Sequence, residues 1–535
     1  MMFHMQRYQR YLFSILSGIL MIVSFPFTGS LTPLVFIAWI PLLFVEQNIT
    51  EKRYRSGKVF IHAYLTFFIY NIGTTWWVWN ASGGGAAMAI ILNALFMALT
   101  VQLFHFTKRK LNLKYAAFTL PLFWVAFEYL HLRWEMSWPW LMFGNVFSIT
   151  PSWVQWYSFT GTMGGTLWVL YVNILLFEAL RAYHISNRLK FKKYSAFGLG
   201  LLLIPLSTSL IQYYAYQDQG RKMEVVVVQP NIDPYKEKFT GSIDGQMNKM
   251  LSLADEKVTK NTELVIFPET AISWSFYESD FSRLPIYPLL IEHMKKWGGA
   301  QLLTGASTAQ FFERKHSRAS MKMNGGPGYI ESYNSSLILR GEGDYEFLHK
   351  SKLVPGVEVL PFSDWFPFLE EWSINNGGTS GTLGVEKEPK VLKDGKFCFA
   401  SVICYESIYG DFVRQQCKKG ADAIFIITND GWWEDTPGYK QHCSFASLRA
   451  IENRRSIARS ANTGTSCFVN QRGDITQKTE WWKPAVIRSN VFLNKEKTVY
   501  MRTGDLLAKI GLALSFSILL MSLLRIFKPV KPATH

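Results

Sequence analysis

Long apolar segments crowd the first 215 residues of the chain, and one more lies close to its C-terminus. A helix needs roughly 20 apolar residues to cross the hydrocarbon core of a bilayer, which is about 30 Å thick. Hydrophobic residues make up 49% of the chain and charged residues only 18%, a composition that excludes intrinsic disorder. Eight segments predict membrane-spanning helices: 11–27, 33–46, 58–79, 86–107, 116–132, 160–181, 196–215 and 508–527.

The positive charge of the chain lies mostly in these apolar regions. Of the formal net charge of +16, residues 1–221 carry +11 and residues 222–509 carry only +2. A nucleic-acid-binding domain would itself carry the basic residues, so we expect no nucleic-acid partner. Lys and Arg in short loops stay on the cytoplasmic side, and here they fall in alternate loops. The pattern predicts both termini in the cytoplasm and residues 216–507 on the opposite face of the membrane.

Residues 222–500 show short apolar runs separated by polar, helix-like segments, which is typical of an α/β domain. Helices are predicted over 287–297 and 441–460. The chain therefore divides into a seven-span membrane domain over 1–215, an α/β domain over 222–500 and an eighth helix over 508–527. The predicted strands are 223–228, 263–267, 301–305, 336–339, 397–403, 423–428 and 466–470.

Three reactive side chains stand where an apolar strand ends, a position that fixes a side chain and leaves it reachable. Glu269 follows the strand 264–268, Lys350 lies at the edge of an extended segment, and Cys404 follows the strand that ends at residue 403. A buried cysteine is usually inert, and only its position marks Cys404 among the five cysteines. No metal-binding spacing of Cys or His is present, so we expect no metal and no cofactor.

Several short motifs around these residues resemble those of the nitrilase superfamily, whose members use a Glu-Lys-Cys triad and fold as an α-β-β-α sandwich. A nitrilase-like domain inserted between seven membrane spans and an eighth is similar to the membrane-integrated apolipoprotein N-acyltransferase family. The resemblance covers nearly the whole chain, through the order of its motifs and the membrane frame. The matching motifs are 267–271, 350–358, 403–406, 428–433, 441–452 and 459–464.

The resemblance implies a role for each matching residue. Glu269 would be the general base, Lys350 the catalytic lysine and Cys404 the nucleophile. Lys352 competes with Lys350, but the family spacing before Leu-Val-Pro selects Lys350. Phe239 stands where the family tends to have Trp, so it is assigned no role. The remaining implied site residues support or line the site: Glu358, Tyr405, Glu406 and Trp432.

The implied reaction is the transfer of a fatty acyl chain from a phospholipid to the N-terminal amine of a diacylglyceryl-cysteine lipoprotein. A thioester on Cys404 would divide this transfer into two easier steps. The Lys350 ammonium and the backbone N–H of Tyr405 are the donors we expect for the tetrahedral oxyanion. The resemblance also implies a monomer in the bacterial inner membrane, with the catalytic domain in the periplasm.

Two other functions remain open from the sequence. One is a membrane-tethered nitrilase-type amidohydrolase, in which water rather than an amine accepts the acyl group. The other is a transporter or binding scaffold with an inactive external domain, although few ionisable residues interrupt the predicted spans. His442 lies beside motif residues without a visible partner in the sequence and is interpreted as structural.

Overall fold

The computed structural model describes residues 5–112, 115–323, 325–362, 365, 382–393 and 397–526, which fall into two compact units. One unit is helical and comprises Met1–Trp76, Ala86–Gln212 and Thr503–His535. The other is an α/β unit that comprises Trp77–Gly85 and Tyr213–Arg502. The segment 77–85, which comprises the last residues of the predicted span 58–79 and the loop to the next span, therefore belongs to the α/β unit.

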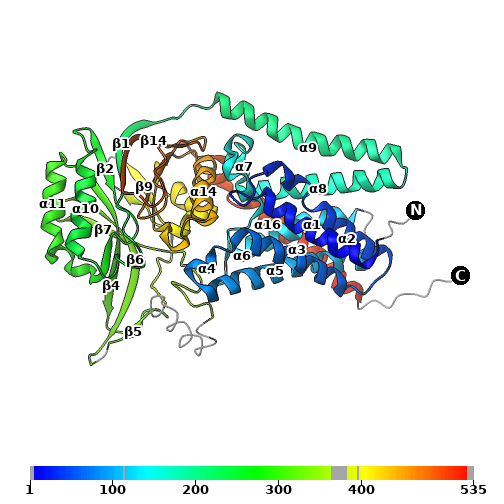
Figure 1. Ribbon diagram of the computed structural model, residues 1–535, viewed down its shortest axis with the longest axis horizontal. Coiled ribbons are helices and arrows are strands. Elements are labelled where there is room, and N and C mark those ends of the chain that lie inside the picture. The colour runs from blue at the N-terminus through cyan, green and yellow to red at the C-terminus, as the bar shows by residue number, and fades with distance from the viewer. Residues whose placement is uncertain are drawn as a thin grey trace. The chain divides into compact units, whose positions relative to one another are not determined.

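The helical unit is built from long helices joined by short turns and single helical turns (Figure 1). Its elements are α1 (Arg7–Ser24), η1 (Thr32–Phe36), α2 (Ile40–Glu51), α3 (Gly57–Thr75), α5 (Gly83–Leu111), η2 (Ala116–Thr119), α6 (Leu120–His131), η3 (Phe143–Ile149), η4 (Pro151–Trp153), α7 (Tyr157–Thr160), α8 (Thr162–His184), α9 (Arg188–Ala215) and α16 (Leu506–Ile526).

Within the described residues, five helical segments are long and apolar enough to cross a membrane. They are Thr32–Glu51, Gly83–Leu111, Thr162–His184, Arg188–Ala215 and Leu506–Leu524, and each coincides with a predicted span. The other three predicted spans overlap with α1, α3 and α6. Because α6 has only 12 residues, it extends about 18 Å, less than the thickness of the hydrocarbon core. The number of spans, eight, therefore stays a prediction.

Small residues allow the helices of this unit to pack closely. A Cβ atom on Gly18 of α1 would stand 2.7 Å from the carbonyl oxygen of Thr66 on α3. Similarly, a Cβ on Gly511 of α16 would stand 2.5 Å from a methyl group of Val125 on α6. Helices in lipid associate through such close backbone contacts because the hydrophobic effect does not drive them together.

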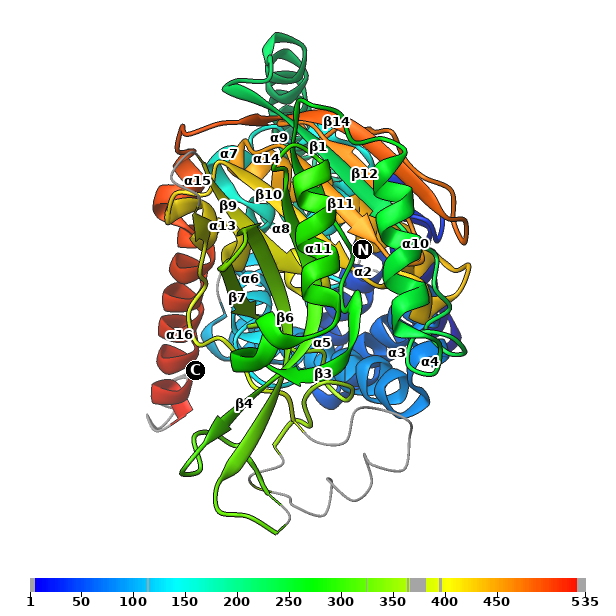
Figure 2. The same ribbon diagram turned by 90° about the vertical axis from the view of Figure 1, so that its left-hand side faces the viewer.

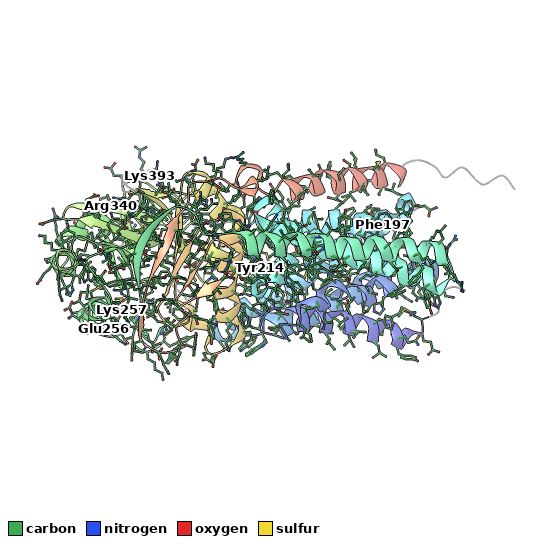
Figure 3. The ribbon with its side chains drawn as sticks, turned by 90° about the horizontal axis from the view of Figure 1, so that it is seen from above. Phe197, Tyr214, Glu256, Lys257, Arg340 and Lys393 are labelled. Atoms are coloured by element: carbon green, nitrogen blue, oxygen red, sulfur yellow. The ribbon has the colours of Figure 1, made fainter. Side chains whose placement is uncertain are left out.

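Few residues of α9 are buried. Only Gly198 and Ser209 of this 28-residue helix are buried. Figure 3 shows the ring of Phe197 on this helix, and 59% of that side chain is exposed. A soluble monomer rarely exposes so long an apolar surface, which suits contact with lipid acyl chains.

The first sheet of the α/β unit has, within the described residues, the strand order β14-β1-β2-β4-β6-β5, with β3 beside β4 and β7 beside β6. Strands β1, β2 and β4 are parallel, whereas β6 runs antiparallel to both β4 and β7. The strands are β1 (Arg221–Gln229), β2 (Thr262–Ile266), β3 (Ile272–Tyr277), β4 (Gln301–Phe312), β5 (Met321–Lys322), β6 (Tyr329–Gly341), β7 (Asp344–His349) and β14 (Ala485–Leu493).

The second sheet has the order β13-β12-β11-β10-β9-β8 among the residues that the structure describes. Its three central strands β9, β10 and β11 are parallel. Their residues are almost all apolar or small and almost all buried, as expected for strands covered on both faces. The strands are β8 (Leu392–Lys393), β9 (Cys398–Ile403), β10 (Ala423–Thr428), β11 (Ile457–Ala461), β12 (Cys467–Val469) and β13 (Ile475–Thr476).

The side chains of β1 point alternately into two hydrophobic cores, and these cores show the order of the layers. Val226 and Val228 point into a core shared with α10 (Ile243–Asp255) and α11 (Ile286–Lys296), which cover the first sheet (Figure 2). Val225 and Val227 point the other way, into a core shared with β9 and β10 of the second sheet. Helices α13 (Gly410–Lys418) and α14 (Pro437–Asn453) contact the second sheet. The layers are therefore helix, sheet, sheet and helix, in a nitrilase-like arrangement.

All seven predicted strands coincide with strands of the structure, and the helix predicted over 287–297 is α11. The helix predicted over 441–460 is wrong beyond Asn453. There Arg454 adopts a left-handed conformation with φ +47° and ends α14, and residues 457–461 form the buried strand β11. The sequence of β11, Ile-Ala-Arg-Ser-Ala, contains a charged and a polar residue and therefore did not indicate a strand.

Candidate active site

The three proposed catalytic residues each follow a strand. Glu269 lies three residues after β2, Lys350 follows β7 directly, and Cys404 follows β9 directly. The backbone N–H of Lys350 donates to the carbonyl of Asn334 on β6 at 2.8 Å, which extends the pairing of β6 with β7. The first sheet thus carries the carboxylate and the amine, and the second sheet carries the thiol.

Lys350 lies between two carboxylates. Its Nζ donates to Oε1 of Glu358 at 2.8 Å and to Oε1 of Glu269 at 3.2 Å. The lysine side chain is 1% exposed, so this ion-paired group is shielded from water. Glu358, which the resemblance implies as a supporting residue, is therefore in direct contact with the proposed catalytic lysine.

Asn334 is a member of this group that the sequence analysis missed. Its Nδ2 donates to Oε1 of Glu269 at 2.8 Å and to Oε1 of Glu358 at 3.0 Å. The amide therefore bridges the two carboxylates that bind Lys350. The only local signal was a run of polar residues, Asn-Ser-Ser, directly before the apolar run Leu-Ile-Leu of the same strand.

The surroundings of Glu269 and Lys350 favour the charged form of both side chains. Burial raises the pKa of Glu269, but the Lys350 ammonium and the Asn334 amide outweigh this effect, so the pKa lies below its usual value. Burial lowers the pKa of Lys350, but Glu269 and Glu358 raise it above its usual value. An ionised carboxylate can accept a proton, and an ammonium can stabilise a developing negative charge.

Cys404 occupies a strained turn between β9 and the single-turn helix η6 (Cys404–Ile408). Its φ is +49°, in the left-handed region, which costs an L-residue about 1–2 kcal/mol. Such a conformation persists only where the surroundings hold it. The strain is consistent with a turn that presents the side chain at the end of the strand.

Glu406 ties this turn to the segment that carries Lys350. Its carboxylate accepts hydrogen bonds from the backbone N–H groups of Ile403 at 2.8 Å, Ser351 at 2.6 Å and Lys352 at 3.2 Å. Burial raises the pKa of Glu406 to about 7, against the effect of these donors. The side chain is fully buried, so it supports the geometry of the site and does not line an open surface.

The thiol of Cys404 lies in the electric field of the charged group. Burial and the Glu269 carboxylate raise the pKa of the thiol above its usual value, and the Lys350 ammonium opposes them. The thiol is therefore protonated at neutral pH. A nucleophilic thiolate forms only when a base removes this proton during the reaction, and the ionised Glu269 is suited to that task.

Tyr405 and Trp432 lie in different surroundings. Tyr405 is buried, and its ring packs edge-on against Tyr409 with centroids 5.3 Å apart. Trp432, in η7 (Asp430–Trp433), is half-buried, and its ring lies 5.2 Å from that of Tyr235. The ring of Trp432 therefore packs against Tyr235. Tyr405 directly follows Cys404 in the chain, and its ring packs against Tyr409.

Lys238 is a second buried amine that the sequence analysis did not identify. Its Nζ donates to the carbonyl oxygen of Glu269 at 3.0 Å. Burial lowers the pKa of Lys238 to about 8, although the charge of the Glu269 carboxylate favours the ammonium. The neighbouring Phe239, to which no role was assigned, is 59% exposed.

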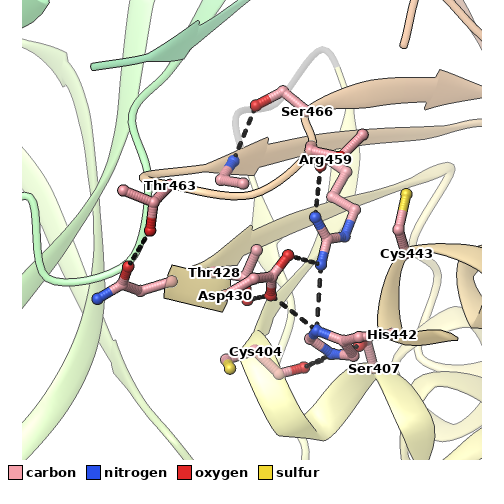
Figure 4. Close-up of polar contacts among 12 residues, drawn as sticks. Cys404, Ser407, Thr428, Asp430, His442, Cys443, Arg459, Thr463 and Ser466 are labelled. Atoms are coloured by element: carbon pink, nitrogen blue, oxygen red, sulfur yellow. Dashed lines mark hydrogen bonds and ion pairs between the residues drawn. The ribbon is translucent and has the colours of Figure 1, made fainter. Parts of the chain in front are cut away.

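A buried polar network lies against the backbone of Cys404 (Figure 4). Ser407 Oγ donates to the Cys404 carbonyl oxygen at 2.8 Å, and Nε2 of His442 lies 3.2 Å from the same oxygen. On its other side, His442 contacts Asp430, which forms an ion pair with Arg459. The histidine interpreted as structural therefore touches the proposed nucleophile through its main chain.

Comparison with known proteins gives matches over both units. Residues 17–175 match the family described as apolipoprotein N-acyltransferase N-terminal domain, and residues 224–498 match the carbon-nitrogen hydrolase family. An apolipoprotein N-acyltransferase of Chlorobaculum tepidum is 29% identical over 530 residues, which cover 96% of each chain. One of Geobacter metallireducens is 26% identical, covering 93% of this chain and 92% of its own. An amidase of known structure from Nesterenkonia sp. aligns at 13% identity with a TM-score of 0.36, covering 55% of this chain and 97% of its own.

Proposed function

The chain belongs to the carbon-nitrogen hydrolase family and, within it, to the apolipoprotein N-acyltransferases, and on this premise we propose that it N-acylates lipoproteins through a thioester on Cys404. The acyl donor is a phospholipid, and the acceptor is the N-terminal amine of a diacylglyceryl-cysteine lipoprotein. The observation that carries the proposal is the buried Lys350 ammonium held between Glu269 and Glu358, beside the segment that Glu406 ties to Cys404.

In the first step, Glu269 takes the thiol proton as the sulfur of Cys404 attacks the ester carbonyl of the phospholipid. A carbon–sulfur bond forms, and the carbonyl oxygen becomes an oxyanion that the Lys350 ammonium and the N–H of Tyr405 stabilise. When the carbonyl re-forms, the ester carbon–oxygen bond breaks. The alkoxide leaves as lysophospholipid with the proton that Glu269 held, and the fatty acyl group stays on Cys404.

In the second step, the lipoprotein amine attacks the thioester. An α-amino group has a pKa near 8, so a fraction is unprotonated at neutral pH and can act as the nucleophile. Glu269 accepts the proton that the amine loses, and the carbon–sulfur bond breaks. Transfer of that proton to the departing sulfur restores the thiol and releases an amide product. The same carboxylate thus serves as base and then as acid in both steps.

The membrane frame supplies the donor in this proposal. Apolar helices of the helical unit would keep the chain in the inner membrane, where phospholipid is the surrounding solvent. The loop charges support an eight-span topology with the domain over 222–500 in the periplasm. We propose that the enzyme acts there as a monomer.

Transfer of label from donor to acceptor tests this function. Purified protein is incubated with a phospholipid that carries a labelled acyl chain, alone or with a diacylated lipopeptide. Intact-mass measurement should find one acyl adduct without the lipopeptide and a labelled amide with it. Both should be absent from Cys404→Ala and present in Cys417→Ala, which changes a buried cysteine on α13.

Two results would contradict the proposal. An adduct that persists in Cys404→Ala would reject the nucleophile. Label that appears only as free fatty acid, with the lipopeptide present, would identify the chain as the hydrolase, because water rather than the amine would then accept the acyl group.

A further inference from the structure

The protonation of His442 can be read from its neighbours. The hydroxyl of Ser407 donates its proton to the Cys404 carbonyl oxygen, so a lone pair of Ser407 Oγ faces Nε2 of His442 at 2.9 Å. The Cys404 carbonyl oxygen, 3.2 Å from Nε2, is also an acceptor. We therefore assign a proton to Nε2, and with this assignment the carbonyl oxygen of Cys404 accepts hydrogen bonds from two side chains.

The other ring nitrogen is compatible with either charge state. Nδ1 of His442 lies 2.9 Å from Oδ1 of Asp430, an acceptor, and 3.1 Å from Nη2 of Arg459, a donor. With a proton on Nδ1 the ring binds Asp430, and without one it accepts from Arg459. The Nε2 proton faces Cys404 in both cases.

Asp430 holds the ring of His442 in place, because its own carboxylate is fixed by other contacts. Its carboxylate also accepts from Thr428 Oγ1 at 2.9 Å and from Arg459 at 2.7 Å, and both Asp430 and Arg459 are fully buried (Figure 4). Burial raises the pKa of Asp430, but Arg459 and His442 hold it below its usual value, so the carboxylate stays charged. The ring of His442 is therefore fixed from behind, and its Nε2 is aimed at one peptide group.

That peptide group joins Cys404 to Tyr405. The carbonyl of Cys404 and the N–H of Tyr405 belong to the same planar trans unit, so they point in opposite directions. Fixing the carbonyl toward Ser407 and His442 consequently aims the N–H away from them. A hydrogen bond to the carbonyl end of a peptide also polarises its N–H end, which strengthens that donor.

We propose that His442, together with Ser407, is a positioning residue that aims the N–H of Tyr405 at the oxyanion formed when the acyl group bonds to Cys404. The inference rests on the proposed role of Cys404 as nucleophile. It assigns to a buried histidine outside the Glu-Lys-Cys group a role in stabilising the transition state, exerted through the backbone.

Two substitutions of similar size separate positioning from packing. In His442→Gln the side-chain amide can place an N–H near the position of Nε2, whereas His442→Met fills the space without a donor. Each purified variant is acylated with p-nitrophenyl butyrate, and Cys404 is alkylated with iodoacetamide in a parallel experiment followed by peptide mass. Acylation passes through an oxyanion, but alkylation is a direct displacement that forms none.

We expect His442→Met to lower the maximal rate constant of acylation roughly 10- to 100-fold at an unchanged half-saturating ester concentration, because one oxyanion donor is misaligned. Its alkylation rate should stay within about threefold of the wild type, and His442→Gln should resemble the wild type in both reactions. Equal acylation by the Gln and Met variants would overturn the proposal. So would a parallel loss of acylation and alkylation in His442→Met, because that result indicates a displaced thiol.

A second variant protects the test against misfolding. Ser407→Ala removes the other donor to the Cys404 carbonyl and deletes a single oxygen atom. In Ser407→Ala we also expect slower acylation and an unchanged rate of alkylation. Acylation at the wild-type rate in this variant would count against the proposal. The ester probe needs neither phospholipid nor lipoprotein. If the wild type reacts with this ester but not with phospholipid, the proposed function fails, and the Gln and Met comparison still decides the positioning role.

Discussion

The ammonium of Lys350 lies 2.8 Å from the carboxylate of Glu358, eight residues further along the chain. A second carboxylate, Glu269, binds the same ammonium from a different strand end, and Asn334 donates to both carboxylates. Two negative charges and one positive charge are thus enclosed in a space that water scarcely reaches. The group thus holds an ionised carboxylate that can remove the proton of a protonated thiol and an ammonium that can stabilise the anion formed afterwards.

Removal of the lysine should damage both stability and chemistry. Lys350→Met leaves two buried carboxylates without their cation, which should cost about 3–5 kcal/mol of unfolding free energy. We expect a lower thermal midpoint in detergent and no acyl adduct. The matched control is Lys352→Met, which changes the competing lysine of the same motif, whose ammonium lies 5.4 Å from the centroid of the Tyr409 ring. Equal midpoints and equal acylation of the two variants would refute the assignment.

Neutralisation of Glu269 should make the Cys404 thiol easier to alkylate but should abolish acyl transfer. The Glu269 carboxylate raises the pKa of the thiol, so Glu269→Gln should lower it and increase the thiolate fraction at neutral pH. Alkylation by iodoacetamide, followed from pH 6 to 10, should shift to lower pH by roughly one unit or more. Acyl transfer should nevertheless be lost, because the proton acceptor is gone.

The control for this experiment is Glu263→Gln on β2, whose partly exposed carboxylate forms an ion pair with Arg221 at 2.9 Å. Its alkylation profile should match that of the wild type. An unchanged profile in Glu269→Gln would show that Glu269 does not act on the thiol electrostatically.

Much of the site could be predicted because strand ends are local features of a sequence. Apolar runs before Glu269 and Cys404 indicate strands, and a reactive side chain just beyond such a run indicates a position at the sheet edge. The contact between Lys350 and Glu269, in contrast, is a tertiary contact. It depends on the pairing of β6 with both β4 and β7, which no local pattern encodes.

The residues that were missed act through tertiary contacts. Asn334 reaches the carboxylates only because β6 places it beside Lys350, and His442 meets the Cys404 carbonyl only because α14 packs against η6. Lys238 lies in a segment without regular structure, where sequence periodicity is uninformative. Each of these side chains is polar and buried, and burial of a polar group is a property of the folded chain.

Glu406 should make stability depend on pH in an identifiable way. Its pKa is about 7 in the folded chain, against 4.5 as the unperturbed value, so the folded state binds more protons between these limits. The contribution of Glu406 to the unfolding free energy is therefore present below pH 4.5 and is lost as pH rises through 7, by on the order of 2–3 kcal/mol. Glu406→Gln does not titrate and lacks this loss.

The thermal midpoint of Glu406→Gln should accordingly lie furthest below that of the wild type near pH 5, with a smaller gap at pH 8. Differential scanning measurements of both proteins in the same detergent and buffers provide the comparison. A gap that widens with pH would mean that the folded chain favours the carboxylate rather than the acid, which is the reverse of the expected linkage.

Lys238 should affect the thiol with a sign opposite to that of Glu269. At pH 7 its ammonium is largely protonated, since its pKa is about 8, and a positive charge near Cys404 favours the thiolate. Lys238→Met should therefore shift the alkylation profile of Cys404 to higher pH, whereas Lys238→Arg should retain the charge and shift it less. Lys236→Met, which changes an exposed lysine two residues away, should leave the profile unchanged. A shift to lower pH in Lys238→Met, or the same shift in Lys236→Met, would exclude Lys238 as a charge that acts on the thiol.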